Sequence, residues 1–257
     1  MNIYQHFRPE EREFIDQVIN WKEYVEQSYA PKLTDFLDPR EQQILAAIIG
    51  KDPEVKWELF GGAPGTERKR ALLFPEYLEV QSDDFQVKLF GIDYAKKFIN
   101  IEHRQVLGSL MSLGLKRGKF GDILIEGENV QFFAAAEIAE YIRLQLEAIG
   151  RASINLTELP LEKASAIDEE WNEMNATVSS LRLDTVMSAL FNLSRQKSQL
   201  LIQHGHVKVN WTAIENTAFE CAEGDIISAR GYGRAKMISI EGKTKKDKYR
   251  VIAGRKK

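Results

Sequence analysis

The most constraining feature of the sequence is a pair of short helical patterns followed by a basic strand, between residues 181 and 210. Ser194 caps the second pattern and Gly205 ends it. In the strand that follows, Lys208 faces away from the two valines on either side of it. The apolar stripe of the first helix consists of Leu183, Val186, Met187 and Leu190, and further strands are expected near 226–230, 234–240 and 249–252.

The net charge of −3 is the sum of a basic region and an acidic remainder of the chain. Residues 181–257 contain 15 Lys and Arg against 7 Asp and Glu, so their net charge is +8, and residues 1–180 carry −11. A basic module on an acidic body is typical of a protein that binds a polyanion. The alternative is a solvated lysine-rich tail, because 243–248 and 255–257 contain seven of the 15 basic residues.

The first two thirds of the chain show two further α+β patterns. The earlier one predicts an N-terminal α+β domain with two helices, the second capped by Asp38 and ended by Gly50, and with strands at 55–60 and 71–74. The later one has the order strand, helix, strand, strand, helix, strand, with its second helix over 135–149. That order predicts a ferredoxin-like βαββαβ domain, a topology shared by RNA-recognition motifs and many other domains. The predicted boundaries are 1–76 and 77–160 for these domains, 161–180 for a linker or connecting helix, and 181–257 for the C-terminal domain.

Two adjacent phenylalanines bear on whether the middle domain can bind bases as an RNA-recognition motif does. Phe132 and Phe133 lie in its third strand and face opposite sides of the sheet. At most one of them could therefore stack on a base. The strand also lacks the basic and glycine start of the usual aromatic motif. We expect both side chains to belong to the core.

Four blocks of the C-terminal domain, at their spacing, resemble the S4 RNA-binding domain. They are Arg182-Leu183-Asp184, Ser194-Arg195, the run from Leu201 to Asn210, and Gly224-Asp225-Ile226-Ile227. The resemblance implies that two helices and the following basic strand present one positive surface to folded RNA. The sequence departs from the family at Trp211, where many members have glycine, and at 196–199, where a more alanine-rich run is usual.

The positions of the basic residues favour the same interpretation. Arg182 begins the first helix, and Arg195 and Lys197 lie in the first turn of the second, where the helix dipole favours acids. Phosphates that approach the free N–H groups explain these bases better, although each base taken singly could be a solvated surface charge. Asp184 is expected to orient Arg182 or Arg195. The predicted RNA-binding residues are Arg182, Asp184, Arg195, Lys197, Lys208, Arg230, Arg234 and Lys236.

Motifs outside the C-terminal domain extend the resemblance over nearly the whole chain. The run from Leu33 to Pro39, Gly61-Gly62 with Glu67 to Ala71, and His103-Arg104 with the run from Lys116 to Ile123 are similar to the YlmH family. Membership implies a bacterial cytoplasmic protein that binds rRNA of the large ribosomal subunit, and peptidyl-tRNA, in ribosome-associated quality control. It also implies a link to cell division and to quality-control or division proteins as partners. Candidate further RNA patches are Arg104, Lys116, Arg117 and Lys119, and separately Arg68, Lys69 and Arg70, with solvated loops as the alternative.

Composition restricts the other classes of function. Cys221 is the single cysteine, so intramolecular disulfides are excluded, and with four scattered histidines we expect no metal and no cofactor. No apolar run long enough to span a membrane occurs, so we expect no membrane insertion. The run from Arg182 to Thr185 also resembles the motif around the catalytic aspartate of pseudouridine synthases, but here it begins the S4 helix itself. We predict a non-catalytic RNA-binding factor, with an RNA-modifying enzyme targeted by its S4 domain and a cell-division adaptor as alternatives.

Overall fold

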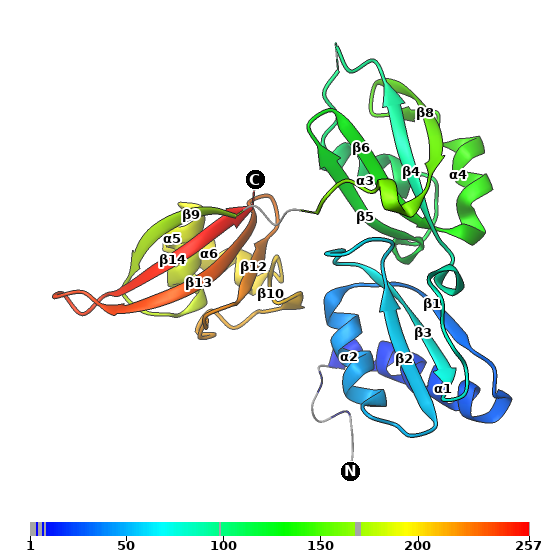
Figure 1. Ribbon diagram of the computed structural model, residues 1–257. Helices are drawn as coiled ribbons and strands as arrows, with labels where there is room; N and C mark the ends of the chain where they lie inside the picture. The colour runs from blue at the N-terminus through cyan, green and yellow to red at the C-terminus, as the bar shows by residue number, and fades with distance from the viewer. Residues whose placement is uncertain (1–3, 5–6, 8, 98, 168–170, 257) are drawn as a thin grey trace. The chain divides into compact units, whose positions relative to one another are not determined.

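The structure is a computed structural model that describes residues 4, 7, 9–97, 99–167 and 171–256. It divides into two compact units, 1–167 and 168–257 (Figure 1). Both units combine helices with antiparallel sheets, which confirms the predicted α+β class. The division of the first unit at residue 76 stays a prediction. Short 3-10 turns occupy Pro9–Glu11, Ser82–Phe85, Arg117–Lys119, Ala136–Ile138 and Leu161–Lys163.

The first unit begins with two helices on a three-stranded sheet of order β1-β3-β2. Asp38 caps α2 by accepting from the Glu41 amide at 2.9 Å, and the Glu41 carboxylate accepts from the Asp38 amide at 2.6 Å. Gly50 ends the helix, as predicted. The strand β1 was not expected, and its register with β3 shifts between Leu33 and Phe36. The elements are α1 (Arg12–Ser28), β1 (Lys32–Leu37), α2 (Pro39–Ile49), β2 (Val55–Phe60) and β3 (Lys69–Pro75).

A five-stranded sheet of order β5-β6-β4-β8-β7 forms the middle of the chain. Without the short β7, this is the strand order of the predicted ferredoxin-like domain. The second helix is shorter than the expected 135–149, because a 3-10 turn precedes it and the chain after it enters β7. The elements are β4 (Val87–Tyr94), α3 (His103–Ser112), β5 (Phe120–Glu126), β6 (Asn129–Ala135), α4 (Ala139–Gln145), β7 (Ala148–Ile149) and β8 (Ala152–Leu159).

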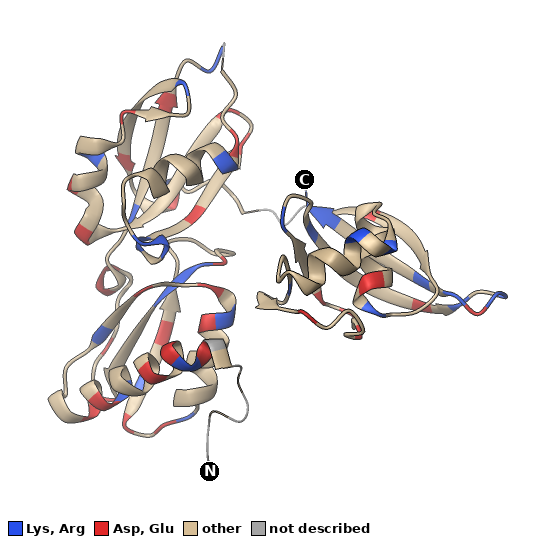
Figure 2. Cartoon of the chain, turned by 180° about the vertical axis from the view of Figure 1, so that it is seen from behind, with Lys and Arg blue, Asp and Glu red and all other residues tan. Residues whose placement is uncertain are grey.

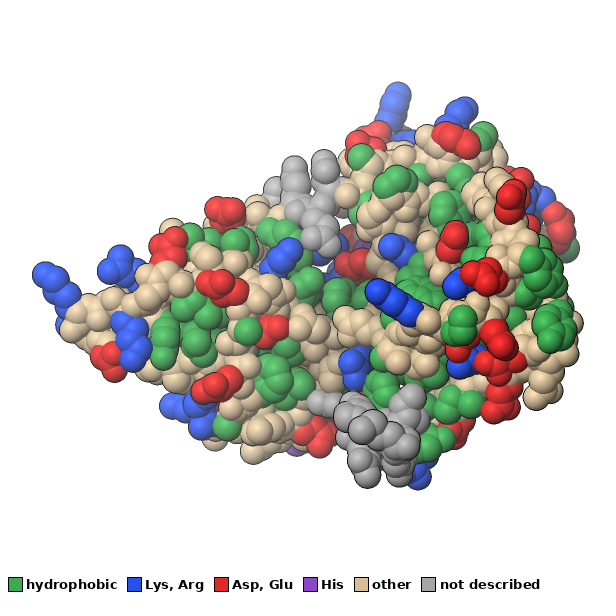
Figure 3. Space-filling model, turned by 60° about the horizontal axis from the view of Figure 1, so that its bottom comes forward, with side chains coloured by type: hydrophobic (Ala, Val, Ile, Leu, Met, Phe, Trp, Pro, Cys, Tyr) green, Lys and Arg blue, Asp and Glu red, His purple; other side chains and the backbone are tan. Residues whose placement is uncertain are grey.

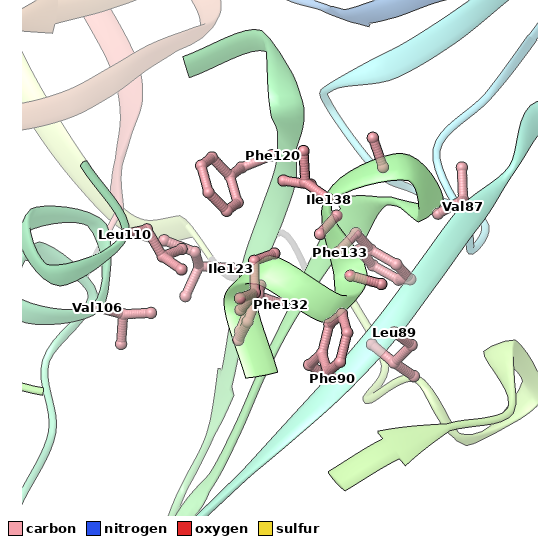
Figure 4. Packing of buried hydrophobic residues seen from close by; sticks show 14 of the residues in the cluster. Val87, Leu89, Phe90, Val106, Leu110, Phe120, Ile123, Phe132, Phe133 and Ile138 are labelled. Carbon is pink, nitrogen blue, oxygen red and sulfur yellow. The ribbon is translucent and has the colours of Figure 1, made fainter. Parts of the chain in front are cut away.

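Phe132 and Phe133 are both fully buried, which confirms their predicted place in the core. Phe132 stacks on Phe90, with 5.3 Å between the ring centroids. Figure 4 labels both side chains in the core. Phe133 points to the other face, where a Cβ atom added to Gly62 would lie 2.4 Å from its ring. Phe36 and Phe74 of the N-terminal strands join the same core cluster. The sheet face that an RNA-recognition motif offers to bases is therefore packed against the N-terminal strands here.

The second unit is a six-stranded antiparallel sheet of order β11-β10-β12-β13-β14-β9, with two helices on one face. The segment 161–180, expected as a linker or helix, contains the edge strand β9. This strand pairs with β14 from Val178–Tyr249 to Trp171–Lys256. The elements are β9 (Trp171–Val178), α5 (Leu183–Phe191), α6 (Arg195–Gln203), β10 (Val207–Val209), β11 (Thr212–Ala213), β12 (Ile226–Ala229), β13 (Gly233–Lys243) and β14 (Tyr249–Lys256).

Candidate nucleic-acid interface

The buried carboxylate of Asp184 organises the starts of both helices of the second unit. Its side chain is 0% exposed, whereas Arg182 and Arg195 are 37% and 55% exposed. Arg182 donates from Nε at 3.2 Å and from Nη2 at 3.3 Å, and Arg195 donates from Nε at 3.1 Å. The Gln199 amide donates a further bond at 2.8 Å. One carboxylate thus holds two arginines that reach solvent. The sequence left open whether Asp184 orients Arg182 or Arg195, and Asp184 contacts both.

Backbone contacts fix where this carboxylate lies. Arg182 is the N-cap residue of α5 and pairs with Glu220 in an isolated β-bridge. The Leu183 amide donates to the Phe219 carbonyl at 2.8 Å. Leu183 itself is fully buried in the unit's core. The first turn of α5 is therefore attached to the segment before β12, and Asp184 cannot shift without disturbing that attachment.

The charge balance keeps Asp184 ionised. Burial alone would raise the pKa of this carboxyl, but the hydrogen bonds from Arg182, Gln199 and Arg195 outweigh it and hold the pKa well below its usual range. The same contact raises the pKa of Arg182. Among the described residues, the two Nη atoms of Arg195 have no protein acceptor. A guanidinium whose two Nη groups are not bound by protein acceptors can donate both to one phosphate, as a bidentate contact.

The start of α6 supplies the next basic residue. Ser194 accepts a bond from the Lys197 amide at 3.2 Å, so the helix begins as the sequence predicted. Lys197 is exposed. Figure 2 views the second unit from the helix side and shows Lys and Arg on these helices. We call Arg182, Asp184, Arg195 and Lys197 the helix-start cluster.

The remaining predicted residues of the second unit lie elsewhere. Val207 and Val209 are buried beneath the helices, and Lys208 between them is exposed on the opposite face of the sheet. Arg234 lies in the same row of that face, because Lys208 pairs with Ser228 and Ser228 pairs with Arg234. Lys236 follows two residues later. The single surface implied by the resemblance is thus divided between two faces, and the exposed Arg230 lies in the turn after β12.

The candidate patch in the middle of the chain is largely engaged within its own unit. Arg117 donates to the Phe120 carbonyl at 2.6 Å, and its burial lowers its pKa to about 10. Lys119 bridges Asp35 at 2.6 Å and Glu137 at 2.9 Å. Arg104 is 83% exposed and pairs with Glu102 at 2.7 Å. Arg117 and Lys119 thus have structural partners, and RNA contact at Arg104 and Lys116 stays a prediction.

The third candidate patch, Arg68, Lys69 and Arg70, also contains arginines that are bound within the first unit. Arg70 is 4% exposed at its side chain and donates to Glu137 at 3.1 Å and to the Thr34 carbonyl at 2.7 Å. Arg68 donates to the Phe36 carbonyl at 2.7 Å. Both arginines connect segments of the first unit. Lys69 is the half-exposed residue between them.

Gln199 was not singled out from the sequence as part of the site. It lies four residues after Arg195, so helical spacing places both on one face of α6, and this spacing is a signal for it. The lysine-rich run 243–248, for which the sequence left a solvated tail as the alternative, forms the projecting end of the β13–β14 hairpin. Figure 3 shows basic side chains gathered at this end. The run is part of a hairpin and not a tail.

The described residues contain neither a candidate metal site nor a membrane-spanning helix. Among them, no group of three or more His, Cys, Asp or Glu side chains is arranged to hold a metal ion. His204 and His206 have ring centroids 6.1 Å apart. No helix in the described part of the chain has the length and apolar character to cross a membrane.

Comparison with known proteins agrees with this architecture. Residues 181–227 match the S4 domain, which makes this chain an S4-domain protein. Residues 10–78 match the family model "YlmH, N-terminal", and residues 80–163 match "Putative RNA-binding domain in YlmH". The chain belongs to the YlmH family. It is similar over its whole length, at 48% identity and 99% of the relative, to "Ribosome-associated protein quality control protein P2" of Bacillus subtilis strain 168.

Two further likenesses cover parts of the chain. The solved structure titled "Cell division protein ylmH from Streptococcus pneumoniae" matches with a TM-score of 0.55 and 34% identity, over 64% of this chain and 100% of that one. A 114-residue segment is 32% identical to "Small ribosomal subunit protein uS4c" of Guillardia theta, and it covers 40% of this chain and 55% of that protein. The predicted family assignment is confirmed.

Proposed function

We propose that this protein is a non-catalytic, cytoplasmic RNA-binding factor that associates with the large ribosomal subunit and contacts rRNA and peptidyl-tRNA during ribosome-associated quality control. The observation that carries the proposal is the helix-start cluster. Its buried Asp184 orients two solvent-reaching arginines beside the exposed Lys197. Such an arrangement recognises phosphates at defined positions and contains no group placed for covalent chemistry.

The name of the Bacillus relative supports the ribosomal part of the proposal. The +8 charge of residues 181–257 supports a polyanionic partner. Asp184 is inaccessible to solvent and accepts bonds from both arginines and Gln199. This environment favours a positioning role for Asp184 over the catalytic role that an RNA-modifying enzyme would require of it.

The test is sucrose-gradient sedimentation of lysates that contain either the wild-type protein or Arg182→Ala/Arg195→Ala, at several salt concentrations. Neutralisation of about five phosphates gives a log–log salt slope of roughly −3.5 to −4.5. Loss of two phosphate contacts reduces the steepness of that slope by about 1.4 to 1.8. We expect wild type with the large subunit and the double variant near the top of the gradient.

A matched control removes two exposed basic residues from the first unit, Lys51→Ala/Arg151→Ala. This variant should sediment as wild type does. Equal sedimentation of wild type and Arg182→Ala/Arg195→Ala would rule out the helix-start cluster as the ribosomal anchor. Ribosome-independent recovery with division proteins after RNase treatment would favour the adaptor alternative, and a modified nucleotide that requires the protein would favour the enzyme.

A further inference from the structure

The sheet of the second unit has a second face that its helices do not cover. The helices α5 and α6 pack on the buried side chains of Val207, Ile227 and Met237. Figure 1 shows the strands of this unit in front of these helices, so the opposite face of the sheet is toward the viewer. The alternate residues lie on that opposite face, among them Lys208 and Lys236. We call this the outer face and define it by Trp171, Lys208, Trp211, Arg234 and Lys236.

Trp211 lies at the tip of the β10–β11 hairpin in an unusual conformation. Asn210 and Trp211 are the two central residues of this turn and have positive φ angles of 48° and 63°. Such turns favour Asn followed by Gly, and a bulky residue in the left-handed region is strained. The guanidinium carbon of Arg234 lies 6.0 Å from the centroid of the indole ring. A strained aromatic residue beside a cation is typical of a binding site.

Trp171 repeats the pairing at the other end of the face. The Nζ atom of Lys236 lies 6.0 Å from its ring centroid. A Cβ atom added to Gly254 would lie 2.5 Å from the Trp171 Cβ atom and 3.4 Å from the Ile238 Cδ1 atom. The missing side chain at Gly254 thus leaves room for the indole to lie against the sheet. The two tryptophans both lie half-buried beside a basic residue.

Sheet register places the basic residues between the two rings. Lys208, Ser228 and Arg234 form one row across β10, β12 and β13. Lys236 pairs with Gly254 on β14, which pairs with Glu173 on β9. Four strand spacings separate β10 from β9 in the sheet order, about 19 Å at ~4.8 Å per spacing. That width corresponds to about five or six stacked nucleotides of one strand, at roughly 3.4 Å each.

We propose that the outer face binds an unpaired segment of RNA, with Trp171 and Trp211 stacking on bases and Lys208, Arg234 and Lys236 contacting the phosphates between them. The proposal rests on the proposed function in one respect, that the protein meets RNA. In the described register rows of Lys208, Arg234 and Lys236, the carboxylate is that of Glu173, so basic residues outnumber acidic ones there and favour a polyanion. Stacking on aromatic rings combined with backbone charge is how single strands are bound without sequence preference.

The test measures binding of the full chain to a fluorescein-labelled 12-nucleotide uridine RNA by anisotropy, at fixed salt, with a blunt-ended RNA duplex as the second probe. Trp171→Ala and Trp211→Gly should each weaken binding of the single strand by about 5- to 150-fold. Binding of the duplex should change little. Single-stranded RNA should also quench the tryptophan fluorescence of wild type more than that of either variant.

Trp211→Gly keeps the experiment decisive, because glycine adopts the turn conformation without strain and the variant should melt at or above the wild-type temperature. Trp57→Phe, in the first unit, is the matched control and should bind as wild type does. Arg182→Ala/Arg195→Ala should lose ribosome sedimentation and keep oligonucleotide binding, so the two proposals fail separately. The outer-face proposal is overturned if the wild-type protein does not bind the oligonucleotide, or if both tryptophan variants bind it as tightly as the wild-type protein does. It is also overturned if these variants lose only a co-purifying protein.

Discussion

Asp184→Asn separates the geometry of the helix-start cluster from its charge. The substitution keeps the shape of the side chain and replaces one acceptor oxygen by an NH2 group. Both oxygens of Asp184 accept from arginine: Oδ1 accepts from Arg182, and Oδ2 accepts from Arg182 and Arg195. In either orientation the new NH2 group therefore faces a guanidinium donor. The variant also raises the positive charge of the cluster by one.

The magnitude follows from the burial of the carboxylate and the exposure of its partners. A hydrogen bond to a charged group contributes about 1.5–3 kcal/mol, and a buried group left without its partner costs about 1–3 kcal/mol. Both guanidinium groups are more than a third exposed, so water replaces part of what they lose. We expect Asp184→Asn to lower the free energy of unfolding of the second unit by about 1–2 kcal/mol. The measurement is equilibrium urea denaturation of the full chain, with unchanged denaturant dependence.

Two explanations of RNA binding, by charge alone or by oriented arginines, predict opposite changes in affinity for Asp184→Asn. If charge alone governs binding, the extra positive charge of Asp184→Asn strengthens ribosome association. If the carboxylate orients the arginines, the same variant binds more weakly despite its added charge. We expect weaker binding in the sedimentation assay. Stronger or unchanged binding, together with unchanged stability, would refute the orienting role of Asp184.

The acid dependence of stability has a defined sign. The folded-state pKa of Asp184 is depressed below the unfolded value of about 3.9, so its stabilisation is present above that value. Stability is lost as the pH falls through the folded pKa, at up to about 1.4 kcal/mol per pH unit for one proton. The difference between wild type and Asp184→Asn should therefore be constant near pH 6 and shrink below pH 4. A difference that stays constant to pH 2 would contradict the depressed pKa.

Two further predictions concern other parts of the chain. Arg70→Met removes a nearly buried guanidinium that joins Glu137 and the Thr34 carbonyl, and it should destabilise the first unit by about 2–4 kcal/mol in urea denaturation, since Glu137 is partly exposed. The neighbouring Lys69→Met is the control, with an expected change within about 0.5 kcal/mol, and equal effects would contradict the structural role of Arg70. Burial raises the pKa of the Cys221 thiol to about 12. The folded protein should therefore resist iodoacetamide at pH 8 and react when unfolded in urea, and fast alkylation of folded protein would show the thiol to be accessible.

Local signals were sufficient to predict much of the fold. Capping residues gave the start of α2 at Asp38 and of α6 at Ser194, and both caps form. The strand β9 was missed because its partner β14 lies far along the chain. Its alternation was present, since Met174, Ala176 and Val178 are less exposed than the polar residues between them. Because β9 has few apolar residues and is stabilised by pairing with β14, its local pattern did not predict a strand.

RNA contact by the predicted site residues stays a prediction, and the sequence did not predict how these residues are arranged. Arg117 and Lys119 are basic residues in a loop, and nothing near them in sequence indicates that Lys119 binds Asp35. Ion pairs between distant segments follow from packing and not from local pattern. The resemblance to the S4 domain implied one surface shared by the helices and the strand of Lys208, whereas the alternation of Lys208 with the two valines places it on the other side of the strand. The tryptophans of the outer face come together only through the sheet order.

The pairing of β14 with β9 also sets the order of events during synthesis. Because β9 precedes both helices and β14 follows all the other strands, the sheet closes only after residues through Lys256 have left the ribosomal exit tunnel. The first unit can fold while the rest of the chain is still being translated, since domains fold as units from the N-terminus. Long-range strand pairing of this kind is slow, because its loop must close before the contacts form. A nascent chain therefore lacks a completed sheet in its second unit until β14 has emerged from the tunnel.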